Sequence, residues 1–322
     1  MSHLSEGSGG GELAVCLSSS HLGFQVHAGF LSGLLGLGIR PQHVSGASSG
    51  AYVGGLYAAG FSPEKIKEIL SAPAMTRAFW EWRGPLRGLG MLLNLNGFTG
   101  FLTGKHVARY LGRLLGSQRI EDCPEAELSI AVTNLTQHRT EIVRAGPLKE
   151  FIMASCAVPC LFQAYRVGEN LYLDGAVADS SPLSHLIDDP RIGTIIVHVV
   201  NHPDHLPSQR ARTVFDALGR SHQIVTDRLL ALGVESARRQ GKRIIVLTSE
   251  VPRFRFGSPK SVEPYFTSGR TLVENNRKEL LEATQSRKAT NPQPANAQDF
   301  FLRDPACPSI SFPKAVGRAS LS

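Results

Sequence analysis

The sequence predicts an α/β fold with a mostly parallel central sheet, because short apolar runs alternate with stretches of helical periodicity. An apolar run at residues 12–18 leads through a loop into a helical pattern at 24–37, and a strand follows that ends near residue 46. A connection of this length is a crossover, so the two strands are expected to be parallel. A glycine-flanked serine comes next, at the carboxyl end of the strand, where the functional sites of open α/β folds collect.

The composition predicts one large domain with flexible ends. The chain has 322 residues, of which 42% are hydrophobic and 19% are charged, as is typical of a globular protein. We expect a flexible N-terminus at 1–11, a folded domain at 12–284 and a disordered tail at 285–322. The tail is rich in Ser, Asn, Pro, Gln and Ala and has little periodicity.

Charge and targeting patterns bear on partners and location. A formal charge of +7 favours contact with an anionic surface such as phospholipid, but no dense Lys/Arg run with interleaved aromatic residues points to nucleic acid. The chain has no signal-peptide pattern and no apolar run of about 20 residues, so the sequence predicts a cytoplasmic protein that contacts membranes at most peripherally. The five cysteines have irregular spacing and are expected to be free thiols that bind no metal. No pattern fixes an oligomeric state.

The remaining elements follow from their local patterns. Ser62 and Pro63 supply an N-cap and a first-turn proline, which predict a helix through Leu70. A short helix at 153–158 is expected to stop at Pro159. The other predicted helices cover 105–116, 214–240 and 265–284, and the other predicted strands cover 128–133, 141–144, a hairpin at 165–174, 194–200 and 243–247.

Residues 75–104 differ from the rest of the chain in composition and periodicity. The segment contains both tryptophans of the protein and three nearby arginines, at Trp80, Trp82, Arg77, Arg83 and Arg87. The apolar stretch after them is interrupted too often by glycine and polar residues for a regular core helix. Tryptophan and arginine suit the headgroup layer of a membrane, so one interpretation is a mobile lid at a lipid-facing mouth. The alternative is an insertion packed on the core, and the sequence does not decide between the two.

Ser48 is the candidate nucleophile. It lies in Gly46-Ala47-Ser48-Ser49-Gly50, which fits the G-x-S-x-G pattern of a nucleophile elbow. Such an elbow needs small residues on both sides of the serine, because the strained turn presses its neighbours against the adjacent strand, and Gly46 and Gly50 meet that demand. The helix that follows would present unpaired amides and a positive dipole end to a developing oxyanion. A plain Ser/Gly turn is the alternative.

A serine nucleophile also needs a group that accepts its proton. Asp174 is the candidate, because it follows the short strand at 171–173 and precedes Gly175 and Ala176 on a tight turn. A carboxylate that only forms the turn is the alternative interpretation. Spacing selects none of the 11 histidines as the base, including His198, His202, His205 and His222.

These residues together resemble the patatin-like phospholipases. Ser48 in its G-x-S-x-G pattern and Asp174 in Asp-Gly-Ala match the paired site motifs of that family. Further likeness follows in chain order, in Leu13–Leu17 with His27–Leu31, in Ala154-Ser155 with Val158-Pro159 and Phe162, and in Asp179–Leu183. The resemblance covers about residues 12–200 and implies a three-layer α/β fold.

The resemblance implies a Ser-Asp dyad without histidine. Ser48 would attack the ester carbonyl of a phospholipid or related lipid, and Asp174 would act as general base. An acyl-enzyme on Ser48 would then be hydrolysed, as in a phospholipase A, with no metal and no cofactor.

One loop departs from the family pattern, which has a glycine-rich G-G-G-x-[RK]-G sequence at this place. The candidate oxyanion donors in this chain are the amides of Ser19, Ser20, His21, Leu22 and Gly23, followed by Phe24. Two alternatives therefore stay open. One is a catalytically degenerate protein that binds lipid or a protein partner, and the other is an α/β-hydrolase with a Ser-Asp-His triad. Cys160 also stands where the family usually has glycine.

Overall fold

The computed structural model describes residues 11–20, 23–78, 81, 83–95, 97–201, 213–251 and 262–285. The expected flexible N-terminus at 1–11 and the expected tail at 285–322 lie almost entirely outside these residues. The other predicted features outside them are His21, Leu22, Trp80, Trp82, His202, His205 and Cys307.

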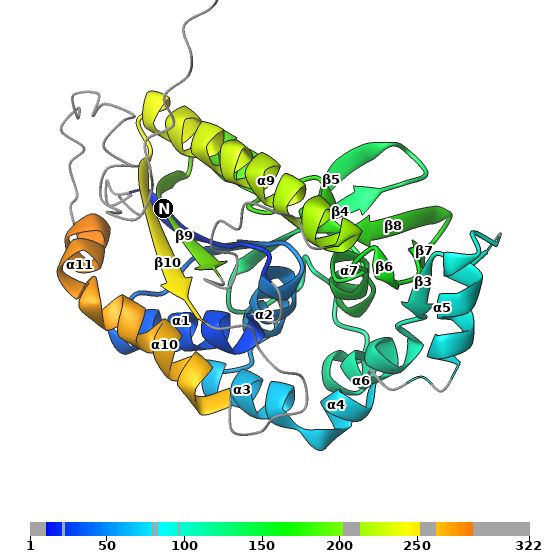
Figure 1. The fold of residues 1–322 in the computed structure, drawn as a ribbon. Coiled ribbons are helices and arrows are strands. Elements are labelled where there is room, and N and C mark those ends of the chain that lie inside the picture. The colour runs from blue at the N-terminus through cyan, green and yellow to red at the C-terminus, as the bar shows by residue number, and fades with distance from the viewer. Residues whose placement is uncertain are drawn as a thin grey trace, which may run out of the picture. The chain divides into compact units, whose positions relative to one another are not determined.

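The fold is built on a sheet whose strands lie in the order β10-β9-β1-β2-β4-β8-β7, with β5 paired to β4 (Figure 1). The pairs from β10 to β4 are parallel, and the pairs made by β5, β7 and β8 are antiparallel. The predicted α/β fold with a mostly parallel central sheet is therefore confirmed. The bounds are β1 Glu12–Leu17, β2 His43–Gly46, β4 Glu127–Asn134, β5 Arg139–Val143, β7 Tyr165–Val167, β8 Asn170–Asp174, β9 Ile192–Asn201 and β10 Arg243–Glu250.

Helices cover both faces of the sheet, which gives three layers. Leu13, Val15 and Leu17 of β1 pack into one core cluster with residues of α1, α2 and α10. Ala14 and Cys16 point to the opposite face, because successive side chains of a strand alternate, and they pack with residues of α8 and α9. The bounds are α1 Phe24–Gly36, α2 Ser49–Ala58, α3 Pro63–Ser71, α6 Lys105–Leu115, α7 Leu148–Ser155, α8 Ser184–Asp188, α9 Val214–Arg239, α10 Val262–Asn275 and α11 Arg277–Gln285.

Two predicted helices differ from the structure. Helix α7 begins after Pro147 and ends at Ser155, so the prediction at 153–158 was placed too late. Pro159 has no amide hydrogen to donate to the Ser155 carbonyl, so the helix cannot continue through it, and beyond the helix the carbonyl of Ala157 accepts the amide of Asp174. The predicted helix at 265–284 is two helices, α10 and α11. The side-chain amide of Asn276 donates to the carbonyl of Leu272 at 2.7 Å, and such side-chain bonds compete with the helical ladder.

The described part of the segment at 75–104 consists of short elements that pack on the rest of the fold. It contains α4 (Pro73–Ala78), α5 (Gly84–Leu92) and β3 (Gly100–Leu102), and β3 pairs in parallel with β6 (Cys160–Phe162). Helix α5 is regular, but it is not a core helix, since its leucines are exposed. The sequence did not reveal the β3–β6 pair, because strands of three residues carry little periodicity.

Candidate active site

Ser48 occupies the turn between β2 and α2 with a strained backbone. Its φ of 51° and ψ of −117° lie in a region that L-residues rarely adopt. A Cβ on Gly50 would lie 2.0 Å from the carbonyl oxygen of Leu17, and a Cβ on Gly46 would lie 2.5 Å from the carbonyl carbon of Gly50. Gly50 therefore lets the turn approach β1, and Gly46 leaves room for the start of α2.

Asp174 meets Ser48 across the sheet. It ends β8, which pairs with β4, and β4 pairs with β2, so two strand spacings separate the residues' backbones. The Ser48 Oγ donates a hydrogen bond to Asp174 Oδ2 at 2.6 Å, although the two residues are 126 positions apart. A Cβ on Gly175 would lie 2.2 Å from the carbonyl oxygen of Ala131, so the Asp-Gly sequence is also a packing requirement. The structure thus brings the two candidate residues into direct contact.

The carboxyl of Asp174 is buried and its pKa is shifted. The residue is 2% exposed, and burial raises its pKa to about 7, because the charged form loses solvation. Hydrogen bonds from the Ser48 hydroxyl and from the Ala176 amide, the latter at 2.8 Å, favour the carboxylate and offset part of this shift. A carboxyl with a pKa near neutrality can take up and release a proton at working pH.

Further residues of the segment before Pro159 hold the elbow. The Ser48 amide donates to Ser155 Oγ at 2.9 Å, and Ser155 is fully buried at the end of α7. The Cys156 thiol donates to the Ser48 carbonyl at 3.2 Å, and burial raises its pKa. These contacts fix both sides of the strained residue. Sequence reasoning assigned no role to Ser155 or Cys156, since only the fold brings them to residue 48.

The serine-rich loop after β1 is held by hydrogen bonds between hydroxyl and amide groups. Ser20 donates its amide to Ser49 Oγ at 3.0 Å, and the two hydroxyls also bond at 2.8 Å. The Gly23 amide donates to Ser20 Oγ at 3.1 Å, and the Ser19 amide donates to the Ser180 carbonyl at 2.8 Å. These amides of the described part of the loop are therefore engaged within the protein. The candidate donors at His21 and Leu22 lie outside the described residues.

Another amide is better placed to receive an anion. Ser49 occupies the first position of α2, and its amide has no hydrogen-bond acceptor among the residues that the structure describes. The first amides of a helix are unpaired and carry the positive end of its dipole. This donor directly follows Ser48, the candidate nucleophile. The G-x-S-x-G pattern of the elbow could have identified this amide from the sequence, because it predicts that a helix starts directly after the serine.

The histidines divide into groups by location. His198 is fully buried, and its Nδ1 lies 2.9 Å from His27 Nδ1 and its Nε2 lies 3.0 Å from Ser249 Oγ. His222 of α9 lies near the dyad, with Nε2 2.7 Å from the carbonyl oxygen of Ala176. No histidine lies between Ser48 and Asp174, since these two residues bond directly.

The cysteines that the structure describes are free, as expected from their spacing: Cys16, Cys123, Cys156 and Cys160. Cys160 is exposed at the start of β6 with a φ of 68°. A positive φ favours glycine, which explains why glycine is the usual residue at this position.

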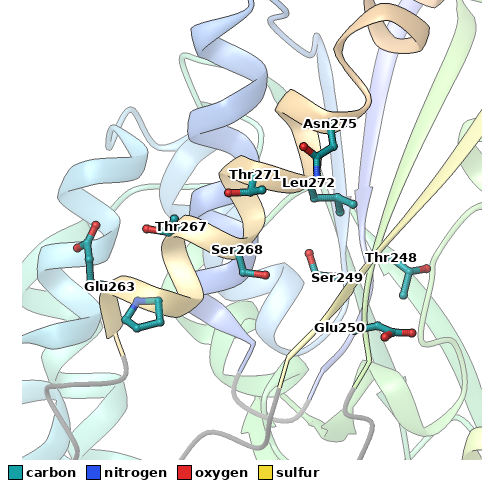
Figure 2. Close-up of a pocket in the computed structure, with 10 residues that line it drawn as sticks. Thr248, Ser249, Glu250, Glu263, Thr267, Ser268, Thr271, Leu272 and Asn275 are labelled. Carbon is teal, nitrogen blue, oxygen red and sulfur yellow. The ribbon is translucent and has the colours of Figure 1, made fainter.

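A separate cavity of about 680 Å³ lies between β10 and α10 (Figure 2). Ser249 and Glu250 line it from the strand, and Ser268 and Thr271 line it from the helix. Ser48 and Asp174 are not among its lining residues, so this cavity is distinct from the dyad.

Comparison with known proteins assigns the chain to a family. The model of the patatin-like phospholipase family matches residues 15–187, which is more than half of the chain and includes both Ser48 and Asp174. The chain belongs to the patatin-like phospholipase family. The three-layer fold that the sequence resemblance implied is thus confirmed.

Relatives of this patatin-like protein include enzymes and proteins of unassigned activity. It is 28% identical over 189 residues to the lysophospholipase NTE1 of Debaryomyces hansenii, a match that covers 58% of this chain and 12% of that protein. It is 27% identical over 179 residues to an uncharacterized NTE family protein of Mycobacterium bovis, covering 55% of this chain and 46% of that one. The chain therefore spans less than half of the length of these relatives.

A solved structure shares the fold. The crystal structure of VipD from Legionella pneumophila superimposes with a TM-score of 0.50 and 14% identity, over 84% of this patatin-like chain and 67% of VipD. In the part of the chain that the structure describes, no helix combines the length and the apolar composition that a membrane crossing requires.

Proposed function

We propose that this patatin-like protein is a serine hydrolase of lipid esters, with Ser48 as nucleophile and Asp174 as general base. The observation that carries the proposal is the 2.6 Å hydrogen bond from Ser48 Oγ to Asp174 Oδ2. A hydroxyl that already donates to a carboxylate needs no further movement to transfer its proton. The family and the named activity of the NTE1 relatives support a phospholipid or related lipid as the substrate class.

The proposed reaction has two halves. Ser48 Oγ attacks the ester carbonyl while its proton passes to Asp174, and the carbonyl oxygen takes up the negative charge. The intermediate then collapses, and the alcohol or lysolipid leaves with the proton from Asp174. In the second half, Asp174 removes a proton from water, the water oxygen attacks the acyl carbon, and the proton returns to Ser48 as the fatty acid leaves.

The developing oxyanion requires donors near Ser48. We assign this role to the Ser49 amide at the start of α2, because it is adjacent to the nucleophile and is not engaged within the described chain. The Ser20–Ser49 hydrogen bonds hold the described part of the neighbouring loop against the elbow. The amides of His21 and Leu22 remain candidates for further donors.

The burial of Asp174 supports its role as base. An exposed aspartate has a pKa near 4, and its carboxylate is too weak a base for a serine hydroxyl at neutral pH. Burial raises the pKa of Asp174 to about 7, which brings its basicity close to that of a histidine. The dyad can therefore dispense with an imidazole.

The test is labelling with a fluorophosphonate together with hydrolysis of a soluble short-chain ester and of phospholipid. We expect the intact protein to be labelled at Ser48, and we expect Ser48→Ala and Asp174→Asn to lose turnover by at least about 1000-fold. Ser117→Ala is the matched control, because Ser117 is exposed in the turn after α6. Labelling at another serine, or full activity in Ser48→Ala, would refute the proposal.

A second candidate function is binding of lipid or a protein partner without turnover. It is favoured by the engagement of the Ser19, Ser20 and Gly23 amides within the protein, because the oxyanion site then depends on fewer donors. Loss of one donor costs about 100- to 1000-fold in rate. Retained lipid binding with no turnover of any ester would support this function and exclude the first.

A further inference from the structure

Helix α5 exposes its largest apolar side chains to solvent. Leu86, Leu89, Leu92 and Leu93 are between 53% and 73% exposed. Leu86, Leu89 and Leu93 recur at spacings of three and four residues, so they form one face of the helix, and Leu92 adjoins it. We call residues 83–95 and 97–102 the apolar lobe, and it also exposes Leu95, Phe98 and Phe101 in part.

Two glycines of α5 lie against aromatic rings of the same segment. A Cβ on Gly88 would lie 2.2 Å from the ring of Phe101, and a Cβ on Gly90 would lie 2.7 Å from the ring of Phe98. The glycines are thus buried beneath side chains of the lobe while the leucines are exposed, whereas a surface helix usually turns its apolar side chains toward the core. Exposed apolar patches of this kind mark interaction sites.

A buried ion pair fixes the orientation of the lobe. The side chains of Glu81 and Arg87 are 8% and 13% exposed and bond to one another. Glu81 also accepts the amides of Thr103 and Gly104, and Arg87 Nε donates to the Phe101 carbonyl at 2.7 Å. Arg87 therefore holds α5 against β3, and the expectation that it contacts lipid headgroups does not fit its position.

A stripe of cations follows the lobe along the chain. Lys105, Arg109 and Arg113 are exposed at four-residue spacing on α6, which begins three residues after β3 ends. Among the described residues, no carboxylate pairs with these three cations, so their charge is available to an external anion. We call these three residues the basic stripe.

The lobe connects to the dyad through β6. Strand β3 pairs with β6, with Gly100 opposite Cys160 and Leu102 opposite Phe162. Strand β6 begins five residues after Ser155, which binds the Ser48 amide. Figure 1 shows α5 and β3 beside β6 at the β7 end of the sheet.

We propose that the apolar lobe and the basic stripe dock this protein on an anionic phospholipid bilayer. The leucine face of α5 enters the acyl region, and Lys105, Arg109 and Arg113 contact the headgroups. Apolar side chains beside unpaired cations complement a bilayer surface, which is apolar at depth and negative at its boundary. The inference rests on the proposed function, since a lipid hydrolase must reach substrate that is held in a membrane.

The experiment is sedimentation with phosphatidylcholine vesicles that contain or lack phosphatidylserine, and it has two test variants. We expect the lobe variant Leu86→Ser/Leu89→Ser/Leu93→Ser to bind both kinds of vesicle at least about tenfold more weakly, because it removes inserted apolar surface. We expect the stripe variant Lys105→Gln/Arg109→Gln/Arg113→Gln to lose about 100-fold in affinity for phosphatidylserine vesicles at low salt. The stripe variant should also lose most of the salt dependence of binding.

Matched controls carry the same changes elsewhere. Helix α9 exposes leucines of similar accessibility, so Leu218→Ser/Leu229→Ser/Leu232→Ser is the control for the lobe. Exposed cations distant in sequence provide Arg228→Gln/Arg238→Gln/Lys278→Gln as the control for the stripe. Both controls should bind vesicles as the unchanged protein does. Equal loss of binding in test and control variants would overturn the proposal, because it would show that net apolarity or net charge decides binding.

Turnover of a soluble short-chain ester separates this proposal from the proposed function. If the lobe variant keeps this turnover and loses vesicle binding, the docking surface is supported. If the unchanged protein binds vesicles through the lobe but cleaves no ester, docking stands and the hydrolase function falls. Vesicle binding that the lobe variant retains in full would refute docking. So would a concentration-dependent dimer that only this variant abolishes, since a second copy would then occupy the lobe.

Discussion

The carboxylate of Asp174 is buried beside a serine hydroxyl and a backbone amide, and no cation pairs with it among the described residues. A buried aspartate usually carries a cationic partner, which would hold its pKa low and make it a poor base. Here burial dominates, and the pKa rises to about 7. The basicity of the proposed dyad is therefore a consequence of desolvation.

The pH dependence of turnover tests this residue. Since Asp174 must be ionised to accept the proton, kcat/KM for a soluble ester should fall about tenfold per pH unit below about pH 7 and level off above it. A bell-shaped pH dependence of kcat/KM centred near pH 4, or a kcat/KM that is constant from about pH 5.5 to about pH 8.5, would contradict the assigned role.

The stability of Asp174→Asn tests the raised pKa of the same residue. The folded-state pKa of about 7 is above the unfolded value of 3.8, so the wild-type side chain binds a proton more tightly when folded. The stability that the protonated Asp174 side chain contributes is therefore lost as the pH rises through 7. At pH 8 the variant should therefore be inactive yet more stable in urea, by on the order of 1 to 4 kcal/mol.

At the scale of elements, two short segments are bonded to the elbow. The serine-rich loop after β1 is tied to α2 through the Ser20–Ser49 hydrogen bonds, and α7 is tied to the elbow through Ser155. In the described part of the loop, the hydroxyls of Ser19 and Ser20 bond to the hydroxyls of Ser180 and Ser49.

Ser49→Ala tests the loop. The substitution removes the acceptor of the Ser20 amide and the partner of the Ser20 hydroxyl, so the loop is released from α2. We expect kcat to fall about 10- to 100-fold with KM nearly unchanged, while the free energy of unfolding falls by only about 1 kcal/mol.

Ser180→Ala is the matched control for that change. It removes a hydroxyl that bonds to Ser19 Oγ at 2.5 Å, while the Ser180 carbonyl still accepts the Ser19 amide. The control should keep a rate within about threefold of the unchanged protein. Equal rates in both variants and the unchanged protein would show that the Ser20–Ser49 contact positions nothing that the reaction needs.

At the scale of the whole molecule, a buried pair of histidines joins α1 to β9 and β10. His27 and His198 bond through their Nδ1 atoms, Phe30 stacks on His198 with ring centroids 4.0 Å apart, and Ser249 takes the remaining nitrogen of His198. His27 Nε2 is buried with no partner in the described chain. Burial lowers the pKa of His27 to about 3 and lowers that of His198 as well.

The pair should make the fold sensitive to acid. Its folded-state pKa values lie below the unfolded value of 6.5, so the unfolded chain binds more protons and stability falls as the pH drops from 6.5 toward 3. Asp174 and Asp179 act in the opposite direction, because burial raises their pKa values. The effect of the pair must therefore be measured as a difference between variants.

His27→Asn isolates the pair. It removes one titrating group, so the loss of unfolding free energy between pH 7 and pH 5 should be smaller than in the unchanged protein by about 2 kcal/mol. Urea unfolding at both pH values measures this difference. His106→Asn is the control, because His106 is exposed on α6 and has no side-chain hydrogen bond within the described residues, and it should leave the difference between the two pH values as it is in the unchanged protein.

Much of the fold was predictable because its signals are local. Apolar runs and helical spacing gave the strands β1, β2, β4, β9 and β10 and the helices α1, α3, α6 and α9 to within a few residues. The end of α7, the break at Asn276 and the β3–β6 pair were not predictable. Each of these depends on a partner distant in sequence or on a single side chain that competes for a backbone group.

The sequence by itself determined the family, the parallel sheet and the two positions, Ser48 and Asp174, on which the proposed chemistry depends. The two positions follow from short motifs, because a strained turn has room only for small neighbouring residues and the turn at a strand end requires particular residue types. Only the tertiary structure decided that the two side chains meet at 2.6 Å across 126 residues, that Ser49 and Ser155 hold the elbow, and that α5 turns its leucines outward. The physical reason is that burial and hydrogen-bond partners are set by contacts between segments that no local pattern relates.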